Sequence, residues 1–316
     1  MSRNNTLIYK HLVEDFRYKV PVVGLGTHNF YLIHSSALIC IVCSFVSVVA
    51  TLVVSFRSKS ARTFFKSWSK CERFVVYLAV CDGFFNLVHF MDHFHMLTAK
   101  DHVHPIELCE YYGFIMFMFI SAQMLLVSLI AINAFALIKF DKNIDLGKCD
   151  WKLLSLTFGF PFVECLGITI ADEMGPTGVS CGVAGEISLL FLSTIPVLTV
   201  LTLNSFLYSL TWYKIRTETK KLAVTIGNKD DRKALQAART MSLFVFAFII
   251  QWWAAAVYGA WKQVDGNVPL GVIVPAVTFS NIGGILNGIV YFIMRRNRQR
   301  QIIPKTTVIT VKNRKT

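Results

Sequence analysis

One long apolar stretch of the sequence carries ionisable and polar side chains at helical spacing. Asp82, Asn86, His89 and His93 stand at offsets 0, 4, 7 and 11. At 100° per residue, these offsets place the four side chains within about 60° of one another on one helix face. The i, i+4 spacing of the two histidines suits two ligands of one metal ion, and histidine also exchanges protons near neutral pH. The four side chains could also simply line a polar ligand pocket, because they share one face. Ligand binding, metal binding and proton exchange therefore all stay open.

Other candidates lie in separate apolar stretches. Glu164 is a second carboxylate inside such a stretch, and Trp252 and Trp253 are adjacent aromatic side chains in a third. Ionisable groups in apolar segments of membrane-spanning length are costly and mark functional sites. We therefore expect a ligand-binding pocket without a bound metal, bounded by His89, His93, Glu164, Trp252 and Trp253.

The elements that carry these residues are long and apolar. Of the 316 residues, 54% are hydrophobic and only 16% are charged, and the mean hydropathy is +0.52, whereas soluble domains carry roughly 25% charged residues. A helix crosses a bilayer in about 20 residues, and lipid-exposed backbone must satisfy its own hydrogen bonds. We expect an all-α membrane protein, a seven-transmembrane helix bundle over residues 30–294. Its predicted spans are 30–56, 72–98, 109–138, 151–170, 185–213, 238–262 and 268–294.

Positive charge is distributed unevenly among the connecting segments. The net charge is +13, and 26 of the 32 lysines and arginines fall in the tail and in the loops after the first, third and fifth spans. Positively charged loops favour the cytoplasmic side. We therefore expect an extracellular N-terminus over residues 1–29, a basic cytoplasmic tail over residues 295–316, and no nucleic acid as a partner. The sequon at Asn4 would then be an extracellular glycosylation site.

Two of the eight cysteines, Cys109 and Cys181, fall on the extracellular side in this topology. The other six lie within spans or in cytoplasmic loops, where thiols stay reduced. A disulfide between Cys109 and Cys181 is therefore expected. It would tie the loop between the fourth and fifth spans across the top of the bundle.

Small and polar residues share one face of the seventh span, namely Ser280, Gly284, Asn287 and Tyr291. Small residues let helices approach closely in lipid, and polar residues bond across the interface. We expect the polar members and Asp82 to form an activation network that repacks when a ligand binds. Simple packing of the bundle is the alternative interpretation of this stripe.

Two local motifs, together with the cysteine pair, resemble those of G-protein-coupled receptors. Residues 78–82 (LAVCD) match the LAxxD pattern of the second span in rhodopsin-like receptors, and residues 287–291 (NGIVY) match their NPxxY pattern with glycine in place of proline. The resemblance implies a multi-pass receptor in the plasma membrane, surrounded by membrane lipid. It implies an extracellular small-molecule or peptide ligand and a heterotrimeric G protein as partners. It also implies a sodium ion near Asp82, with no other cofactor.

The sequence departs from that pattern at two places. Residues 133–139 lack the Asp/Glu-Arg-Tyr triplet at the end of the third span, and residues 246–253 lack the proline of the sixth. The glycine-rich approach to Asn287 and the Gly-Phe-Pro at 159–161 are more similar to the cAMP-receptor-like branch and its orphan relatives. The triplet forms the usual activation lock of these receptors, and it is missing here. G-protein coupling is therefore implied by the resemblance alone.

A transporter and a retinal protein are two alternative interpretations of a multi-helix membrane bundle. A proton- or metal-coupled transporter could use Asp82, His89, His93 and Glu164. A retinal protein would need a lysine in the seventh span for its Schiff base, and residues 268–294 contain none. The sequence has no P-loop, GxSxG or HExxH motif, so we do not expect an enzyme.

Overall fold

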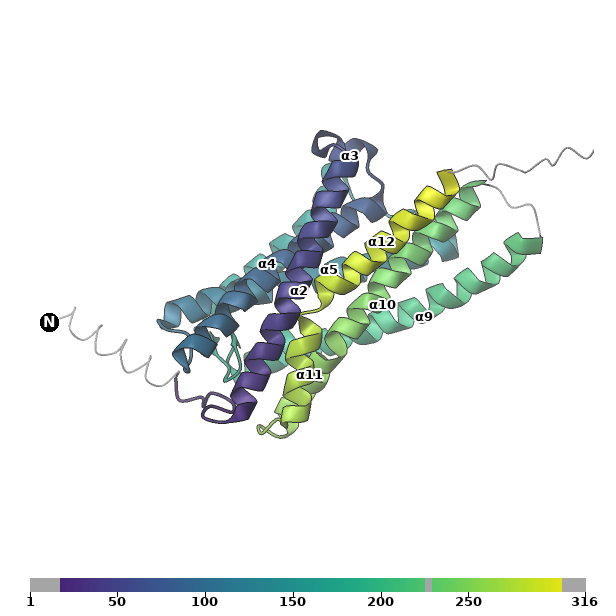
Figure 1. The fold of residues 1–316 in the computed structure, drawn as a ribbon. Helices are drawn as coiled ribbons and strands as arrows, with labels where there is room; N and C mark the ends of the chain where they lie inside the picture. Colours follow the sequence, from purple (N-terminus) through teal and green to yellow (C-terminus); the bar gives the residue numbers. More distant parts are fainter. Residues whose placement is uncertain (1–17, 225–228, 303–316) are drawn as a thin grey trace, which may run out of the picture.

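The computed structural model describes residues 18–224 and 229–302. The long helices lie side by side in one elongated bundle (Figure 1). The α-helices are α2 (His28–Ser58), α3 (Phe64–Ser67), α4 (Lys70–Ala99), α5 (Ile106–Phe140), α6 (Trp151–Leu154), α7 (Phe160–Ile170), α8 (Glu186–Ser188), α9 (Ile195–Val224), α10 (Lys229–Val264), α11 (Leu270–Ser280) and α12 (Gly283–Ile302). The 3₁₀ turns are η1 (Ala61–Thr63) and η2 (Lys148–Asp150), and the π-helical turns are η3 (Ser155–Gly159) and η4 (Leu189–Thr194). An antiparallel hairpin of β1 (Met174–Pro176) and β2 (Cys181–Val183) follows α7.

The bundle contains the membrane spans that the hydropathy of the sequence indicates. Within the described residues, six helical stretches are each long and apolar enough to cross a bilayer, and α11 with α12 forms a bent seventh span. The fold class predicted from the sequence, an all-α seven-helix membrane bundle, is confirmed. Helices extend beyond some predicted spans, since α9 continues to Val224 and α10 begins at Lys229.

The seventh span is not one continuous helix, as a single span over residues 268–294 would suggest. Its two halves meet at a bend of 44° after Ser280. Pro275 removes a backbone donor from α11, and Gly283 and Gly284 open α12 with residues that favour helix poorly. Pro275 affects the bond to residue 271, earlier in α11. At the bend itself, the backbone N–H groups of Asn281 and Ile282 donate three residues back, to Thr278 and Phe279, and the two glycines follow directly. The bend therefore has a local cause in the sequence.

Two other spans contain a π-helical turn. η3 leads into α7 and η4 leads into α9, and a proline is the second residue of each following helix, Pro161 and Pro196. A proline cannot donate to the carbonyl four residues before it. That carbonyl belongs to Thr157 in η3 and to Leu192 in η4, so the i→i+5 bonding of a π turn is locally favoured. π turns recur at functional sites.

The start of α4 is set by a capping box. Ser69 accepts a hydrogen bond from the backbone N–H of Glu72, while the Glu72 carboxylate accepts one from the backbone N–H of Ser69 at 2.7 Å. The same carboxylate pairs with Lys59, just after α2, at 2.8 Å. This end of the α2–α4 connection is therefore tied by charge as well as by the cap.

α5 lies at the centre of the bundle and packs against α4, α7, α9, α10 and both strands. A glycine permits a close backbone approach between α2 and α12, and Figure 1 shows α12 starting beside the middle of α2. A Cβ on Gly284 would lie 2.7 Å from the Ser44 carbonyl oxygen. The Gly284 N–H instead donates to the Ser44 hydroxyl at 3.0 Å. Small residues on the seventh span therefore allow helix contact, as membrane packing requires.

Candidate functional site

A buried carboxylate occupies the centre of a polar network between α4, α5 and α12. Asp82 is 1% exposed. Its Oδ1 accepts a hydrogen bond from Gln123 Nε2 at 2.8 Å, and its Oδ2 accepts one from Asn287 Nδ2 at 2.7 Å. Burial of a carboxylate is costly unless its oxygens are hydrogen-bonded, and each oxygen of Asp82 has an amide donor.

The network continues through Gln123 into α10. Gln123 Oε1 accepts a hydrogen bond from Trp252 Nε1 at 3.2 Å, and Gln251 Nε2 lies 3.4 Å from the same oxygen. Because these donors face Oε1, the amide nitrogen of Gln123 is the atom that faces Asp82. Gln251 Nε2 also donates to the Ser280 carbonyl at 2.9 Å, where the seventh span bends. The network thus connects the second, third, sixth and seventh spans.

Glycine at position 283 makes room for this network. A Cβ there would overlap Asp82 Oδ1 and would lie 2.6 Å from Gln251 Oε1. Any larger residue would have to push the carboxylate and the amide apart. The break in the seventh span therefore brings backbone, rather than a side chain, against Asp82.

The bend also divides the stripe expected on the seventh span. Ser280 ends α11, and its hydroxyl donates to the Val277 carbonyl at 3.2 Å, so Ser280 joins the network through its own carbonyl. Asn287 and Tyr291 lie on α12, where Asn287 contacts Asp82 and Tyr291 is 5% exposed. On a straight helix, the Ser280 hydroxyl would share the face of Asn287 and Tyr291, but the bend puts the Ser280 carbonyl toward the network instead.

Three histidines form a buried chain on the disulfide side of the network. His34 Nδ1 and His93 Nδ1 are 2.7 Å apart, and the His93 and His89 ring centroids are 4.4 Å apart. His89 Nδ1 lies 2.9 Å from Asn281 Oδ1, so that ring nitrogen is a donor. A short Nδ1···Nδ1 contact needs one proton, so one of His34 and His93 donates and the other accepts. The chain thus ties α2 to α4 and α4 to the bend of the seventh span.

Replacing His34 by leucine is expected to destabilise the bundle by about 1–3 kcal/mol, because the buried His93 Nδ1 would lose its partner. Thermal unfolding of the purified protein in lipid nanodiscs measures the change. His95→Leu, on the same helix as His93 but partly exposed, is the matched control and should have little effect. Equal stability of the His34 variant and wild type would show that the contact contributes nothing.

A cavity of about 210 Å³ lies between the network and the hairpin. Its floor includes Trp252 and the end of α11, and its wall includes His89. Residues 179–183 of the hairpin segment cover it, and Lys262 of α10 reaches it from the same end. The cavity is therefore adjacent to the Asp82 network through Trp252 and Ser280.

The structure brings some of the predicted pocket residues together and separates others. His89 and Trp252 line this cavity. His93 is 0% exposed and lies behind His89, packed between the other two histidines. Trp253 lines neither this cavity nor the one described below; it is 45% exposed and packs edge-on against Phe279. Adjacent helical residues point about 100° apart, so Trp252 and Trp253 cannot both face the interior.

Glu164 lines a second cavity, of about 310 Å³, instead of the first. This cavity lies between α5, α7, η4 with α9, and α10. It shares wall residues with the first cavity, among them Ile120, Trp252 and Tyr258. Glu164 and His89 therefore face separate cavities that meet at a common wall.

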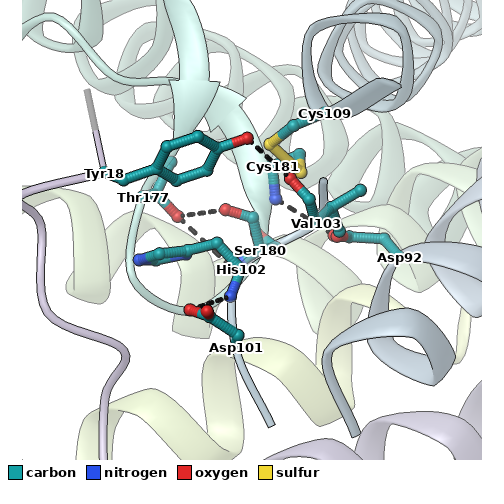
Figure 2. Close-up of a disulfide and its surroundings, with 9 residues drawn as sticks. All are labelled: Tyr18, Asp92, Asp101, His102, Val103, Cys109, Thr177, Ser180 and Cys181. Carbon is teal, nitrogen blue, oxygen red and sulfur yellow. Dashed lines mark hydrogen bonds between the residues drawn. A yellow bond between two sulfur atoms is a disulfide. The ribbon is translucent and has the colours of Figure 1, made fainter. Parts of the chain in front are cut away.

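A disulfide joins Cys109 at the start of α5 to Cys181 in β2, as predicted (Figure 2). Asp92 of α4 lies behind it, and Asp92 Oδ2 accepts a hydrogen bond from the Cys181 N–H at 3.1 Å. The turn of the hairpin is closed by a hydrogen bond from the Thr177 hydroxyl to the Ser180 carbonyl at 2.8 Å. The hairpin is thus fixed over the first cavity by a covalent bond and by hydrogen bonds.

The segment before α2 packs on the same hairpin. The Val23 N–H donates to the Gly178 carbonyl at 2.9 Å. Figure 2 shows the Tyr18 hydroxyl donating to the Val103 carbonyl, at 3.1 Å. His102 Nε2 donates to the Val20 carbonyl at 2.7 Å. This end of the bundle is therefore covered by two chain segments, each hydrogen-bonded to its neighbours.

The opposite end of the bundle has a buried ion pair. Arg73 of α4 donates through Nε and Nη2 to the two oxygens of Asp150, at 2.6 and 2.9 Å. The Tyr77 hydroxyl also donates to Asp150, at 2.9 Å, and Arg73 Nη1 donates to the Trp68 carbonyl. Asp150 is 2% exposed. The loop after α5 is thus held to α4 by a two-point ion pair.

Asn133 of α5 stands where the Asp/Glu-Arg-Tyr triplet is missing. Its Oδ1 accepts a hydrogen bond from the backbone N–H of Ile144, and its Nδ2 contacts the sulfur of Met241. Nearby, an exposed lysine, Lys152, donates to Asp145 at 2.6 Å, and this hydrogen bond lowers the pKa of the Asp145 carboxyl. The loop therefore has one buried and one exposed ion pair.

Metal ligation was one chemistry open to the histidine spacing. Among the residues that the structure describes, no group of three or more His, Cys, Asp or Glu side chains is arranged to hold a metal ion. The described ranges exclude the Asn4 sequon and the tail beyond residue 302.

Several residues of the site were not identified from the sequence. His34, Gln123 and Gln251 each stand alone in an apolar stretch, and the rule that polar groups in spans are functional could have found them. The Arg73–Asp150 pair had no such signal, because both residues looked like ordinary loop charges. Their pairing depends on how the loop after α5 folds back on α4.

The fold and site together define a seven-helix membrane bundle with a polar core and a disulfide-tethered hairpin over a cavity. No protein-family model matches the sequence, and no curated protein matches it. Many solved structures match the fold; one is the crystal structure of squid rhodopsin, with a TM-score of 0.63. The match has 16% sequence identity and covers 87% of this chain and 85% of the rhodopsin chain. The chain therefore has the rhodopsin fold.

Proposed function

We propose that this protein is a G-protein-coupled receptor, which transmits an extracellular signal to a heterotrimeric G protein by helix repacking. The Asp82 network carries the proposal. It touches the first cavity at Trp252 and Ser280, and it holds α12 through Asn287. A ligand in that cavity would therefore contact side chains that also fix the packing of the seventh span.

The mechanism requires two arrangements of the bundle that bind the ligand unequally. A ligand shifts such an equilibrium only by its difference in affinity for the two states. Movement of Trp252 would loosen its hydrogen bond to Gln123, and Gln123 is one of the two donors to Asp82. The other donor, Asn287, begins the path along α12 toward Tyr291. Repacking at Asp82 would thus reach the cytoplasmic end.

The first cavity favours a small ligand over a peptide, since drug-sized pockets are about 300–1,000 Å³ and this one is about 210 Å³. Lys262 and His89 both line it, and Lys262 can donate a hydrogen bond. His89 already donates through Nδ1 to Asn281, so its Nε2 is an acceptor when the ring is neutral. The wall is otherwise largely apolar. We propose a compact ligand with an acceptor or anionic group.

The remaining features of the receptor follow from this proposal. The N-terminus and the hairpin would lie outside the plasma membrane, with Asn4 glycosylated, and the Arg73–Asp150 end would face the G protein. A sodium ion near Asp82 would compete with two amide donors that already occupy its oxygens. Membership of the cAMP-receptor-like branch rests on the sequence motifs alone.

The transporter alternative would need a path that connects its ionisable groups. Asp82 is enclosed by amides, His93 lies behind His89, and Glu164 faces the second cavity. The described residues do not place these four groups on one cavity wall. We therefore favour the receptor. Its mechanism requires that the cavity and the seventh span are linked by packing, and it does not require that the ionisable groups line one path.

Exchange of the carboxylate and the amide tests the network. In Asp82→Asn, one amide would face two amide donors, and one of them would lose its acceptor. We expect a loss of about 1–3 kcal/mol in stability and altered basal or stimulated second-messenger signalling. In Asp82→Asn with Asn287→Asp, the amide now at position 82 can accept from Gln123 and donate to the carboxylate now at position 287, so stability should recover.

The readouts are thermal unfolding in nanodiscs and a broad second-messenger assay in cells, with candidate ligands and pH steps applied outside. Surface expression must be matched between variants. Failure of the exchange variant to regain stability would contradict the hydrogen-bond network. Unchanged signalling in Asp82→Asn, despite lost stability, would contradict its role in activation.

A further inference from the structure

The second cavity has no role in the proposed signalling path. Its wall is almost entirely apolar, formed by leucine, valine, phenylalanine and similar side chains of α5, α7, α9 and α10. Its polar members are Glu164, three hydroxyl side chains (Ser121, Ser193 and Thr194) and the Tyr258 ring. Among the residues that the structure describes, no lysine, arginine or histidine lines it. It is thus an apolar cavity with one carboxylate.

This cavity lies at a gap in the ring of helices. α7 packs on α5, and α9 packs on α5 and α10, but in the described part of the chain α7 makes no extensive contact with η4 or α9. Phe160 at the start of α7 lines the cavity and is 58% exposed, and Phe191 of η4 is 60% exposed. In a membrane, these exposed side chains face lipid. The cavity therefore borders the bilayer.

Glu164 lies well inside the membrane-spanning part of α7. It is six residues before the helix end at Ile170, which is roughly 9 Å at 1.5 Å per residue. Within residues 18–224 and 229–302, no hydrogen bond or ion pair joins Glu164 to another side chain. A carboxylate at such a depth is costly unless a cation or donor accompanies it. The described residues supply no cation at the cavity wall.

Thr194 is a second polar group in this cavity that lacks a partner. It is 5% exposed, and its Oγ1 is buried with no hydrogen-bond partner among the described residues. Several threonines in the spans bond the carbonyl four residues back, as Thr169 does to Cys165 at 2.9 Å. Thr51 and Thr211 also lack a partner for their buried hydroxyls, but neither of them lines this cavity. Thr194 is the last residue of the π turn η4. An unpartnered buried hydroxyl at the cavity wall indicates that a ligand group completes it.

We propose that the second cavity binds a hydrophobic amine that enters from the bilayer leaflet on the disulfide side. The ammonium pairs with Glu164 and donates a hydrogen bond to Thr194, and the hydrocarbon lies along the apolar wall. The binding does not depend on the proposed signalling. An effect of the bound amine on signalling would rest on the proposed receptor function. It would act through Trp252, which lines both cavities.

Photolabelling tests the site directly. The purified full-length protein is placed in nanodiscs that contain a photoreactive hexadecylamine, and labelled peptides are mapped. We expect label on α7 and η4. Glu164→Gln should reduce it about tenfold, since a charge-assisted bond is lost, and Thr194→Val should reduce it about threefold, since a neutral one is lost.

Matched controls separate charge from general apolar binding. Glu186→Gln, at an exposed carboxylate outside the cavity, should label like wild type. A photoreactive hexadecanol of the same length should label wild type no more than the amine labels Glu164→Gln. A water-soluble amine, 3-phenylpropylamine, should not protect the site at equal concentration.

Three results would overturn the proposal. Equal amine labelling of wild type and Glu164→Gln would show that the carboxylate does not select the ligand. Equal labelling of wild type by hexadecanol would show that charge is irrelevant. Full protection by 3-phenylpropylamine would show that the amine arrives from water, not from the bilayer. None of these results depends on second-messenger signalling, so the receptor proposal is tested separately.

Discussion

Replacement of Asp150 by asparagine is expected to lower the free energy of unfolding by about 3–5 kcal/mol, the range found when one partner of a buried ion pair is removed. Arg73 would remain mostly buried, with a 12% exposed side chain, and a neutral amide oxygen would be its only acceptor in place of the two carboxylate oxygens. The Tyr77 hydroxyl would lose a charged acceptor. Asparagine tolerates the left-handed backbone of residue 150, where φ is 57°, so the loss should come from the ion pair.

Two variants give this experiment its controls. Arg73→Met combined with Asp150→Asn should recover much of the loss, because no charge is then left unpaired. Asp145→Asn removes a carboxylate of the same loop whose side chain is 75% exposed, and it should have little effect, since exposed ion pairs contribute little. Thermal unfolding in nanodiscs measures all three. A double variant no more stable than Asp150→Asn would contradict the account.

The ion pair also bears on signalling. It holds the loop after α5 to α4 at the end that we propose faces the G protein. Asn133, in place of the missing Asp/Glu-Arg-Tyr triplet, bonds the backbone of Ile144 in the same loop. This protein therefore fixes the loop after α5 both from α4 and through an amide on α5. At matched surface expression, Asp150→Asn should change the basal second-messenger signal.

Hydropathy and helical periodicity predicted the fold because each membrane span can be identified from its own residues, without knowledge of its neighbours. A run of about 20 apolar residues is sufficient for a span. The side-chain offsets also put Asp82 on the inner face of α4, where it contacts Asn287 of α12. The stripe on the seventh span was less well described, because the arc assumed a straight helix and the bend at Ser280 changed which group of that residue faces Gln251.

Contacts between distant elements could not be derived in this way. The offset of His93 from Asp82 gives its direction on α4, but its 2.7 Å contact with His34 depends on how α2 packs there. The same holds for Glu164, because within the described residues α7 packs mainly on α5 and Glu164 faces a different cavity from His89. The disulfide was the exception. Topology left two cysteines on one side, so pairing followed without knowledge of packing.

Loss of that disulfide is expected to lower stability by about 2–4 kcal/mol. The bond closes a loop with a sequence separation of 72 residues, and long closed loops restrict the unfolded chain most. Some of the restriction persists without it, since α5 and α7 stay in the membrane, so the upper end of the range is a limit. Cys109→Ser with Cys181→Ser removes both thiols, and Cys43→Ser, at an exposed free cysteine of α2, is the control.

The hairpin should loosen without leaving its place. In the double serine variant, Asp92 can still accept from the backbone N–H of residue 181, and the Val23 N–H can still donate to the Gly178 carbonyl. We expect faster hydrogen exchange in residues 174–183 and lower surface expression, with little change in the Asp82 network. Adding Asp92→Asn should increase the exchange further, because it weakens the next contact. If the double serine variant matched the Cys43→Ser control in both stability and exchange, Asp92 and the N-terminal segment alone would hold the hairpin over the cavity.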